Sequence, residues 1–178
     1  RVLPILILLA ATAGCREDGD ITIHSLKFDG VDQIRQSALA AVLQTKKGSR
    51  LPWGPKSYFD RRAFEADLQR IEVFYRDRGF PDARVTSFDV KLNDKQDQVD
   101  VTVFIREGEP IVVDAIDLAG FDVLSEEQRR SLKEGMPLFV DKPLDRQLEL
   151  AARERALNAL RDQGYPYAAV IVEERDTA

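Results

Sequence analysis

The chain has 178 residues, of which 44% are hydrophobic and 32% charged, a composition typical of folded proteins with one or two small domains. Its 31 acidic and 26 basic residues give a net charge of −5, which argues against nucleic acid as the main partner. With one cysteine and one histidine, there is little from which to build a nucleophilic pair or a metal cluster. We therefore expect neither an enzyme nor a bound cofactor or metal.

The chain begins with an apolar segment. Residues 2–13 are almost wholly apolar and are followed by a charged run at 16–18. About a dozen apolar residues are too few for a membrane-crossing helix, which needs roughly 20, but they suit the hydrophobic region of a secretory signal. We predict a signal peptide at 1–14, a short linker at 15–20, and an exported mature chain.

Two cleavage sites compete in this leader. Residues 11–13 have the small-x-small pattern of an ordinary signal peptidase site, whereas residues 12–15, Thr-Ala-Gly-Cys, resemble a bacterial lipobox. We favour lipidation of Cys15, because it lies where a lipoprotein carries its acyl groups and has no second cysteine to pair with. Thr12, where the motif usually has Leu, keeps the alternative open that Cys15 is removed or remains a free thiol.

A strand and a short helix are the first elements expected after the leader. Residues 21–28 alternate between apolar and polar with one break, which predicts a half-buried strand. A helix is expected next, because apolar residues recur at helical spacing over 38–43. Lys46-Lys47-Gly48 is expected to form its last turn and its stop.

A second helix is predicted between Asp60, a good N-cap, and Gly79. Its apolar residues share one face and are Phe64, Leu68, Ile71 and Tyr75. Pro81 cannot continue a helix, so the chain is expected to become extended after this point.

Two strands joined by a hairpin are expected at 83–92 and 99–106. In the first of them, Ala83 and Val85 alternate in one phase, whereas Phe88, Val90 and Leu92 alternate in the opposite phase. A bulge near Thr86-Ser87 is required if all five side chains face the core.

The same order of elements then begins again. Residues 76–83 (RDRGFPDA) and 161–168 (RDQGYPYA) nearly match, and they lie 85 positions apart. After the Glu-Gly-Glu-Pro junction at 107–110 we expect a strand at 113–118, a helix opened by the capping box at 125–128, a longer helix lined by Leu150, Leu157 and Leu160, and a strand from Ala168.

The predicted fold class is therefore α+β, with two tandem β-α-α-β-β units at 21–109 and 110–178. Each unit would be a three-stranded mixed sheet covered by two helices. The second unit would stop before its third strand.

These features together resemble the POTRA (polypeptide transport-associated) repeats of BamA/TamA-type bacterial outer-membrane assembly factors. The resemblance rests on the element order, the Gly-Phe-Pro and Gly-Tyr-Pro turns at Gly79 and Gly164, the junction at 107–110, and the strand ends at 28–30 and 118–120. It implies a periplasmic, outer-membrane-associated arm of tandem domains, normally followed by further such domains and a membrane-embedded barrel. A lipobox is not a usual feature of that family.

A small sheet covered on one face exposes strand edges, and an extended chain can add a strand there by β-augmentation. The resemblance points to the second strand as the receiving edge, with 168–174 as its counterpart in the second unit. The predicted contact residues are Arg84, Val85, Thr86, Ser87, Phe88, Asp89, Val90 and Lys91. Alternatively, the bulge and the charges of Asp89 and Lys91 blunt this edge, which then binds nothing.

The leading interpretation is thus a chaperone-like arm that binds unfolded outer-membrane protein precursors and other assembly-machinery proteins. Contact with the outer membrane would come through a downstream barrel and a lipid anchor. A second interpretation is a lipid-anchored structural or interaction module without client handling, and a third is an accessory domain of a hydrolase. His24, the one histidine, is expected to be a surface side chain of the first strand.

Overall fold

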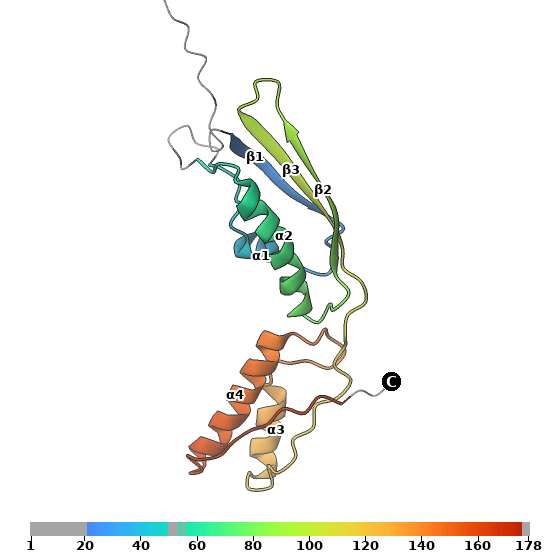
Figure 1. Cartoon of the computed structure of the whole chain (residues 1–178). Helices are drawn as coiled ribbons and strands as arrows, with labels where there is room; N and C mark the ends of the chain where they lie inside the picture. The colour runs from blue at the N-terminus through green and yellow to red at the C-terminus, as the bar shows by residue number, and fades with distance from the viewer. Residues whose placement is uncertain (1–20, 50–53, 55, 176–178) are drawn as a thin grey trace, which may run out of the picture.

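The computed structural model describes residues 21–49, 54 and 56–175. Its elements are β1 (Thr22–Asp29), α1 (Gln36–Val42), α2 (Arg61–Arg76), β2 (Arg84–Leu92), β3 (Gln98–Arg106), α3 (Glu126–Glu134) and α4 (Arg146–Asp162). Figure 1 shows a sheet with α1 and α2 on one face, and α3 and α4 lying beyond the end of α2. The α+β fold class is confirmed. The predicted signal peptide at 1–14 and Cys15 lie outside the described residues.

We refer to residues 21–109 as the first unit and to residues 110–178 as the second unit. The sheet belongs to the first unit and has the strand order β1-β3-β2. The central strand β3 runs parallel to β1 and antiparallel to β2, so the sheet is mixed, as predicted. Four β3 side chains are at most 6% exposed and form the centre of the core: Val99, Val101, Val103 and Ile105.

Both expected irregularities of the strands are present. The register of β1 on β3 shifts between Ile23 and Ser25, at the break in the alternation. The register of β2 on β3 shifts between Val85 and Ser87, which leaves Thr86 as the extra residue of a bulge. The bulge brings Val85 and Val90, which lie in opposite phases of the sequence, against the same core.

The second helix of the first unit forms as expected. The side chain of Asp60 accepts hydrogen bonds from the backbone N–H groups of Arg62 at 2.8 Å and Ala63 at 3.1 Å, which caps α2. Phe64 and Ile71 are buried on its inner face, and Tyr75 is fully buried there.

The first helix is shorter than predicted. It ends at Val42, and Leu43 is already extended with φ −83° and ψ 151°, so Lys46-Lys47-Gly48 is not its last turn. The cause is Asp67, a fully buried residue of α2. Its carboxylate accepts hydrogen bonds from the backbone N–H groups of Gln44 at 3.0 Å and Thr45 at 2.7 Å, which hold the chain extended after α1.

The helices of the second unit are confirmed, with one correction to the predicted core face. Ser125 and Gln128 form the expected capping box of α3. The buried residues of α4 are Ala156 and Leu160, whereas Leu150 is 57% exposed. Of the predicted leucines, Leu160 is therefore confirmed as a core residue, whereas Leu150 is not.

The strands expected at 113–118 and from Ala168 are not formed. In that part of the chain the structure has only an isolated antiparallel bridge between Val112 and Pro143. The strand order of the first unit explains why. Its third strand is the central one, and the described residues of the second unit contain no counterpart of β3. The segments corresponding to β1 and β2 therefore have no strand between them with which to pair.

The turn that ends the longer helix has the same geometry in both units. Gly79 and Gly164 adopt φ values of +86° and +91°, which glycine alone adopts at low cost. The N–H of Phe80 donates to the carbonyl of Tyr75 at 3.0 Å, and the N–H of Tyr165 donates to that of Leu160 at 3.2 Å. The sequence repeat is therefore also a repeat of backbone structure.

Backbone hydrogen bonds connect the two units at this turn. The N–H of Arg146, the first residue of α4, donates to the carbonyl of Asp77 at 2.8 Å, and the N–H of Ile111 donates to that of Gly79 at 2.8 Å. Arg78 and the α4 cap Asp145 lie 3.8 Å apart as a partly buried ion pair. The end of α2 is thus fixed to the start of α4.

Candidate partner-binding edge of the sheet

The predicted binding strand, β2, lies at an edge of the sheet (Figure 1). The N–H of Asn93 donates to the carbonyl of Gln98 at 2.9 Å, which fixes the phase of the β2–β3 ladder. Because backbone groups of antiparallel strands alternate in direction, those of Phe88, Val90 and Leu92 point away from β3. No described residue bonds these outward groups, so residues 88–92 form an open edge.

The beginning of β2 is closed to a partner. Beyond the bulge, the N–H of Val85 also points outward, but it donates to the side chain of Glu72 on α2 at 3.1 Å. The hydroxyl of Thr86 donates to the carbonyl of Phe104 at 3.2 Å. Of the eight residues predicted at this site, Val85 and Thr86 are therefore engaged by the protein itself, and the open edge begins at Phe88.

The opposite edge of the sheet, along β1, is occupied at its start by the chain itself. The N–H of Ile23 donates to the carbonyl of Ser57 at 2.8 Å, and its carbonyl accepts from Gly48 at 3.1 Å. The N–H of Phe59 donates to the carbonyl of Ile21 at 2.8 Å. The loop between α1 and α2 therefore takes the place that an added strand would need there.

The two faces of the sheet beside the open edge differ in polarity. On the helix side, Phe88 packs edge-on against Phe64, with ring centroids 5.3 Å apart, yet it remains 51% exposed, and Leu92 is 52% exposed. On the other side, Asp89 and Lys91 form an exposed ion pair at 2.7 Å. The hydrogen bond that Lys91 donates to Asp89 raises the pKa of Lys91. An added strand would meet apolar surface on one face and charge on the other.

The second predicted edge, at 168–174, is not a strand in the structure. Ala168 and Val170 pack partly against the core of the second unit. The carbonyl of Val170 accepts a hydrogen bond from the Arg153 side chain of α4 at 2.9 Å. This segment therefore lies along α4 and presents no ladder for a partner.

A buried carboxylate that the sequence reasoning missed holds the end of the sheet to the helices. Glu107, directly after β3, accepts hydrogen bonds from the backbone N–H groups of Asp32 at 3.1 Å and Gln33 at 2.9 Å. It also accepts one from the hydroxyl of Tyr75 at 2.8 Å. Burial, and then the bond to Glu107, raise the pKa of Tyr75 far above its usual value. No sequence pattern indicates that Glu107 is buried, because it belongs to the polar Glu-Gly-Glu-Pro junction at 107–110.

Asp67 was also missed, although a signal was present. It lies three residues after Phe64 and four before Ile71, so it occupies the apolar face of α2, where a carboxylate needs partners. Burial tends to raise its pKa, but hydrogen bonds from Thr45, Gln44 and Arg70 outweigh this, and the net effect lowers the pKa of Asp67. Asp67 and Glu107 thus stabilise the scaffold on which the open edge is presented.

Other polar side chains of the described residues pair on the surface of the sheet. His24 is a surface residue of β1, and its Nδ1 lies 2.9 Å from Asp100 on β3. The hydroxyl of Ser25 donates to the same carboxylate, and these two contacts lower the pKa of Asp100. Within the described residues, no group of three or more histidine, cysteine, aspartate or glutamate side chains could hold a metal ion.

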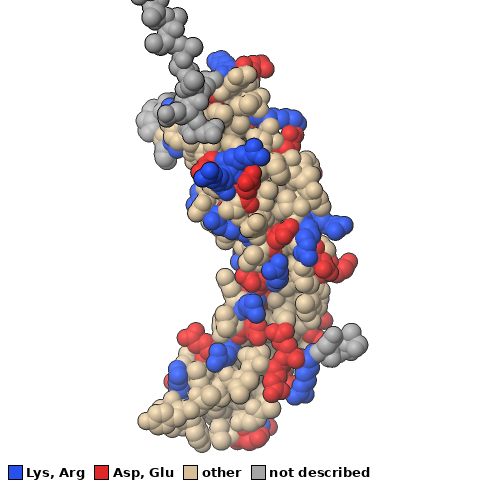
Figure 2. Space-filling model, in the orientation of Figure 1, with Lys and Arg blue, Asp and Glu red and all other residues tan. Residues whose placement is uncertain are grey.

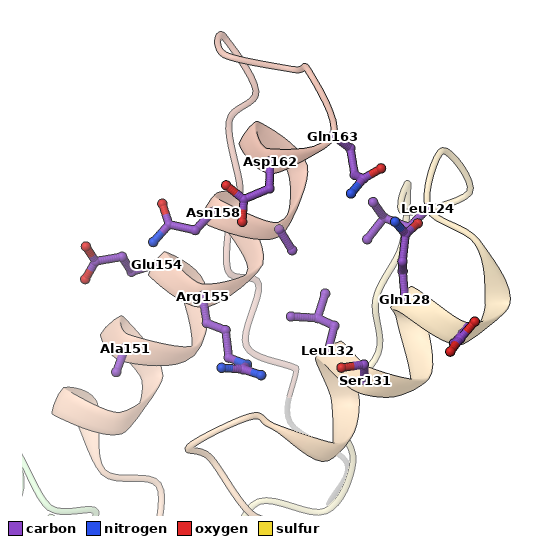
Figure 3. Close-up of a pocket in the computed structure, with 12 residues that line it drawn as sticks. Leu124, Gln128, Ser131, Leu132, Ala151, Glu154, Arg155, Asn158, Asp162 and Gln163 are labelled. Atoms are coloured by element: carbon purple, nitrogen blue, oxygen red, sulfur yellow. The ribbon is translucent and has the colours of Figure 1, made fainter.

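A groove of about 690 Å³ lies between α3 and α4 of the second unit. In Figure 3, Leu124 and Leu132 point into it from the α3 side, and Arg155 reaches across from α4. Its ionisable lining residues are Glu127, Glu154, Arg155 and Asp162. The lining of the groove is part apolar and part polar and contains no nucleophile–base pair, so the edge of β2 remains the stronger candidate site.

Residues 21–108 match the family model POTRA, described as "Surface antigen variable number repeat". The chain is 29% identical over 175 residues to a protein of Treponema pallidum described as a putative outer membrane protein assembly factor, covering 91% of this chain and 19% of that protein. It is 22% identical over 167 residues to the outer membrane protein assembly factor BamA of Neisseria meningitidis, covering 89% and 21%. It therefore spans about a fifth of the length of these curated relatives.

Among solved structures, the chain is similar to POTRA domains 3–5 of BamA from Haemophilus influenzae, with 25% identity and a TM-score of 0.46 over 92% of this chain and 65% of that one. It is also similar to the N-terminal domain of Omp85 from Thermosynechococcus elongatus, with 19% identity and a TM-score of 0.42 over 86% and 56%. Among the residues that the structure describes, no helix combines the length and apolar character needed to cross a membrane.

Proposed function

From the match of residues 21–108 to the POTRA family model, we propose that the chain is part of the periplasmic arm of an outer-membrane protein assembly factor. Its function would be to bind unfolded outer-membrane precursors, or extended segments of other assembly proteins, by β-augmentation. The observation that carries this proposal is the open edge at residues 88–92, where three residues present backbone groups that no described residue bonds.

The site has the physical properties that a binder of varied clients needs. Main-chain hydrogen bonds supply affinity without requiring a particular client sequence. The exposed side chains of Phe88 and Leu92 would cover the apolar side chains of an alternating strand, and Asp89 and Lys91 would face its polar side chains. Barrel strands alternate in this way.

The proposal includes the remaining parts of the chain. Residues 110–178 would be a second POTRA-like unit, and residues 1–14 would direct export. Acylation of Cys15 would attach the arm to a membrane, since several acyl chains on one residue give stable anchoring. These assignments rest on the sequence pattern, because residues 1–20 lie outside the described part of the chain.

A backbone variant tests the open edge. Val90→Pro removes the outward N–H but no hydrogen bond to β3, and proline is tolerated at such edge positions. Val90→Ala is the matched control, because it removes side-chain packing and keeps the N–H. The probe is a synthetic peptide of roughly ten residues with the alternating pattern of a barrel strand, and the readouts are its affinity and the hydrogen exchange of residues 88–92.

We expect the peptide to protect residues 88–92 against hydrogen exchange in the unmodified protein and in Val90→Ala. It should bind Val90→Pro at least about tenfold more weakly, because one lost hydrogen bond costs about 1 kcal/mol and a buried unpaired carbonyl on the peptide adds to this cost. Equal affinity for all three proteins would refute the assignment of the edge. Absence of any peptide binding would favour the alternative, an interaction module without client handling.

A further inference from the structure

The Lys and Arg residues of this acidic protein are unevenly distributed along the chain. Although the net charge is −5, the segment 44–62 contains one acidic residue, Asp60, against six basic ones. The basic residues are Lys46, Lys47, Arg50, Lys56, Arg61 and Arg62. The side chain of Asp60 is already engaged as the N-cap of α2.

The structure gathers the described basic residues at one end of the first unit. Gly48 and Ser57 are hydrogen-bonded to Ile23, and Phe59 is bonded to Ile21. All five described basic residues lie within three positions of these residues in sequence, and all five are exposed: Lys46, Lys47, Lys56, Arg61 and Arg62. We call these five residues the basic end.

Figure 1 shows the start of β1 and the first turn of α2 at the end of the molecule opposite to α3 and α4. In Figure 2, blue side chains lie around this end on the visible face, with red ones among them. The acidic turn with Asp94 and Asp97, which connects β2 to β3, lies on the other side of the start of β1, where the N–H of Thr22 donates to the carbonyl of Asp97 at 2.9 Å. Of the basic end, only Arg61 has an ion-pair partner, Glu65, among the described residues.

We propose that the basic end binds the surface of a membrane that contains anionic phospholipids. Basic side chains near such a surface each contribute attraction that falls off within a Debye length, about 8–10 Å. Four of the five side chains have no competing partner in the described structure, so their charges are available to headgroup phosphates.

The length of the N-terminal tether supports a membrane over other acidic partners. Five residues, 16–20, separate Cys15 from Ile21, and the six residue steps between these two span at most about 22 Å when fully extended. An acyl anchor on Cys15 would therefore hold the basic end, which is bonded to Ile21 and Ile23, close to the headgroups. This orientation is independent of client binding at the edge of β2.

The chain has a native probe for this contact. Trp53 is its only tryptophan, and it belongs to the segment whose two ends, Gly48 and Ser57, are both bonded to Ile23. Lipids brominated on their acyl chains quench tryptophan fluorescence at short range. The full chain is added to brominated vesicles of phosphatidylcholine alone, or of phosphatidylcholine with 30 mol% phosphatidylglycerol (roughly a PS-rich surface in charge density).

Any binding through the apolar leader would be common to both kinds of vesicle, so the difference in quenching between them reports on the basic end. The test variant is Lys46→Glu/Lys47→Glu/Arg62→Glu. The matched control, Arg130→Glu/Lys133→Glu/Lys142→Glu, changes three exposed residues of the second unit by the same total charge. Circular dichroism confirms that both variants are folded.

For the unmodified protein and the control variant, we expect at least about twofold more quenching with anionic vesicles than with neutral ones. This difference should disappear in the test variant. It should also disappear for the unmodified protein in 0.5 M salt, where the Debye length is roughly 4 Å. Equal quenching in both vesicle types would overturn the proposal. So would a test variant that behaves like its control, which would assign the attraction to some other surface.

Discussion

The contact between the two units at Gly79 gives a prediction that the repeat itself makes testable. A Cβ atom on Gly79 would lie 2.8 Å from the backbone nitrogen of Leu144 and 2.9 Å from its carbonyl oxygen. Gly164 occupies the same turn in the second unit, with nearly the same positive φ, but a Cβ there would meet nothing within 4 Å. Gly79→Ala and Gly164→Ala therefore differ mainly in this one contact.

Both substitutions carry the same backbone cost, about 1–2 kcal/mol for a left-handed alanine. Gly79→Ala must in addition displace backbone atoms, which cannot rotate away as a side chain can. The units separate at this point to relieve the overlap, and the bonds from Ile111 to Gly79 and from Arg146 to Asp77 are lost, at about 1 kcal/mol each. The expected total is roughly 3–4 kcal/mol for Gly79→Ala, and 1–2 kcal/mol for Gly164→Ala.

Hydrogen exchange of individual amides checks this reasoning, because it separates local opening from global unfolding. The amides of Ile111 and Arg146 should exchange faster in Gly79→Ala by a factor of at least about 30, corresponding to 2 kcal/mol, while those of β3 change less. In Gly164→Ala both amides should keep their protection. Similar exchange of Ile111 and Arg146 in the two variants would show that Gly79 does not hold the units together.

Three further predictions concern the scaffold of the open edge. Asp67→Asn should lower the free energy of unfolding by about 2–3 kcal/mol near pH 7, because charged hydrogen bonds are lost. Since the folded-state pKa of Asp67 is lowered, the stability that its carboxylate contributes is present above the unfolded pKa of about 3.9 and is lost as pH falls through the folded pKa. Urea titrations at pH 7 and pH 3 should therefore show that the difference in free energy of unfolding between the unmodified protein and Asp67→Asn shrinks in acid. Tyr75→Phe should cost about 1–2 kcal/mol by removing the donor to buried Glu107, and thermal melts that coincide with those of the unmodified protein would contradict this. Deleting Thr86 removes the bulge but leaves Ala83, Val85 and Phe88 in one alternating phase and keeps the register of β2 on β3. We therefore expect both this deletion and Thr86→Ala to change the free energy of unfolding by under about 1 kcal/mol in the same denaturation assay.

Local patterns predicted most of the first unit. The phase reversal between Val85 and Phe88 located the bulge in β2, because side-chain alternation in a strand leaves no other way to bury both sets. Asp60 located the start of α2, and the paired glycine turns located the repeat. These features depend on a few neighbouring residues, which is why they could be predicted from the sequence.

Features that depend on distant contacts could not be predicted in this way. The end of α1 is set by Asp67, more than 20 residues later in the chain. The receiving edge was predicted as Arg84 to Lys91, but Glu72 closes its beginning through the N–H of Val85. The missing strands of the second unit follow from the order β1-β3-β2, since pairing within a sheet requires the central strand, however suitable the outer segments are.

The position of β3 also determines when this fold can be completed. The first unit pairs its first and last strands in parallel, joining residues such as Thr22 and Gln98 across nearly the whole unit. A chain that emerges from the ribosome starting at its N-terminus cannot close the sheet until β3 has appeared and inserted between β1 and β2. Until then both outer strands are unpaired and their apolar faces are open, the condition in which nascent chains aggregate most readily. A protein proposed to protect unfinished β-sheets thus passes through the same vulnerable state during its own biogenesis.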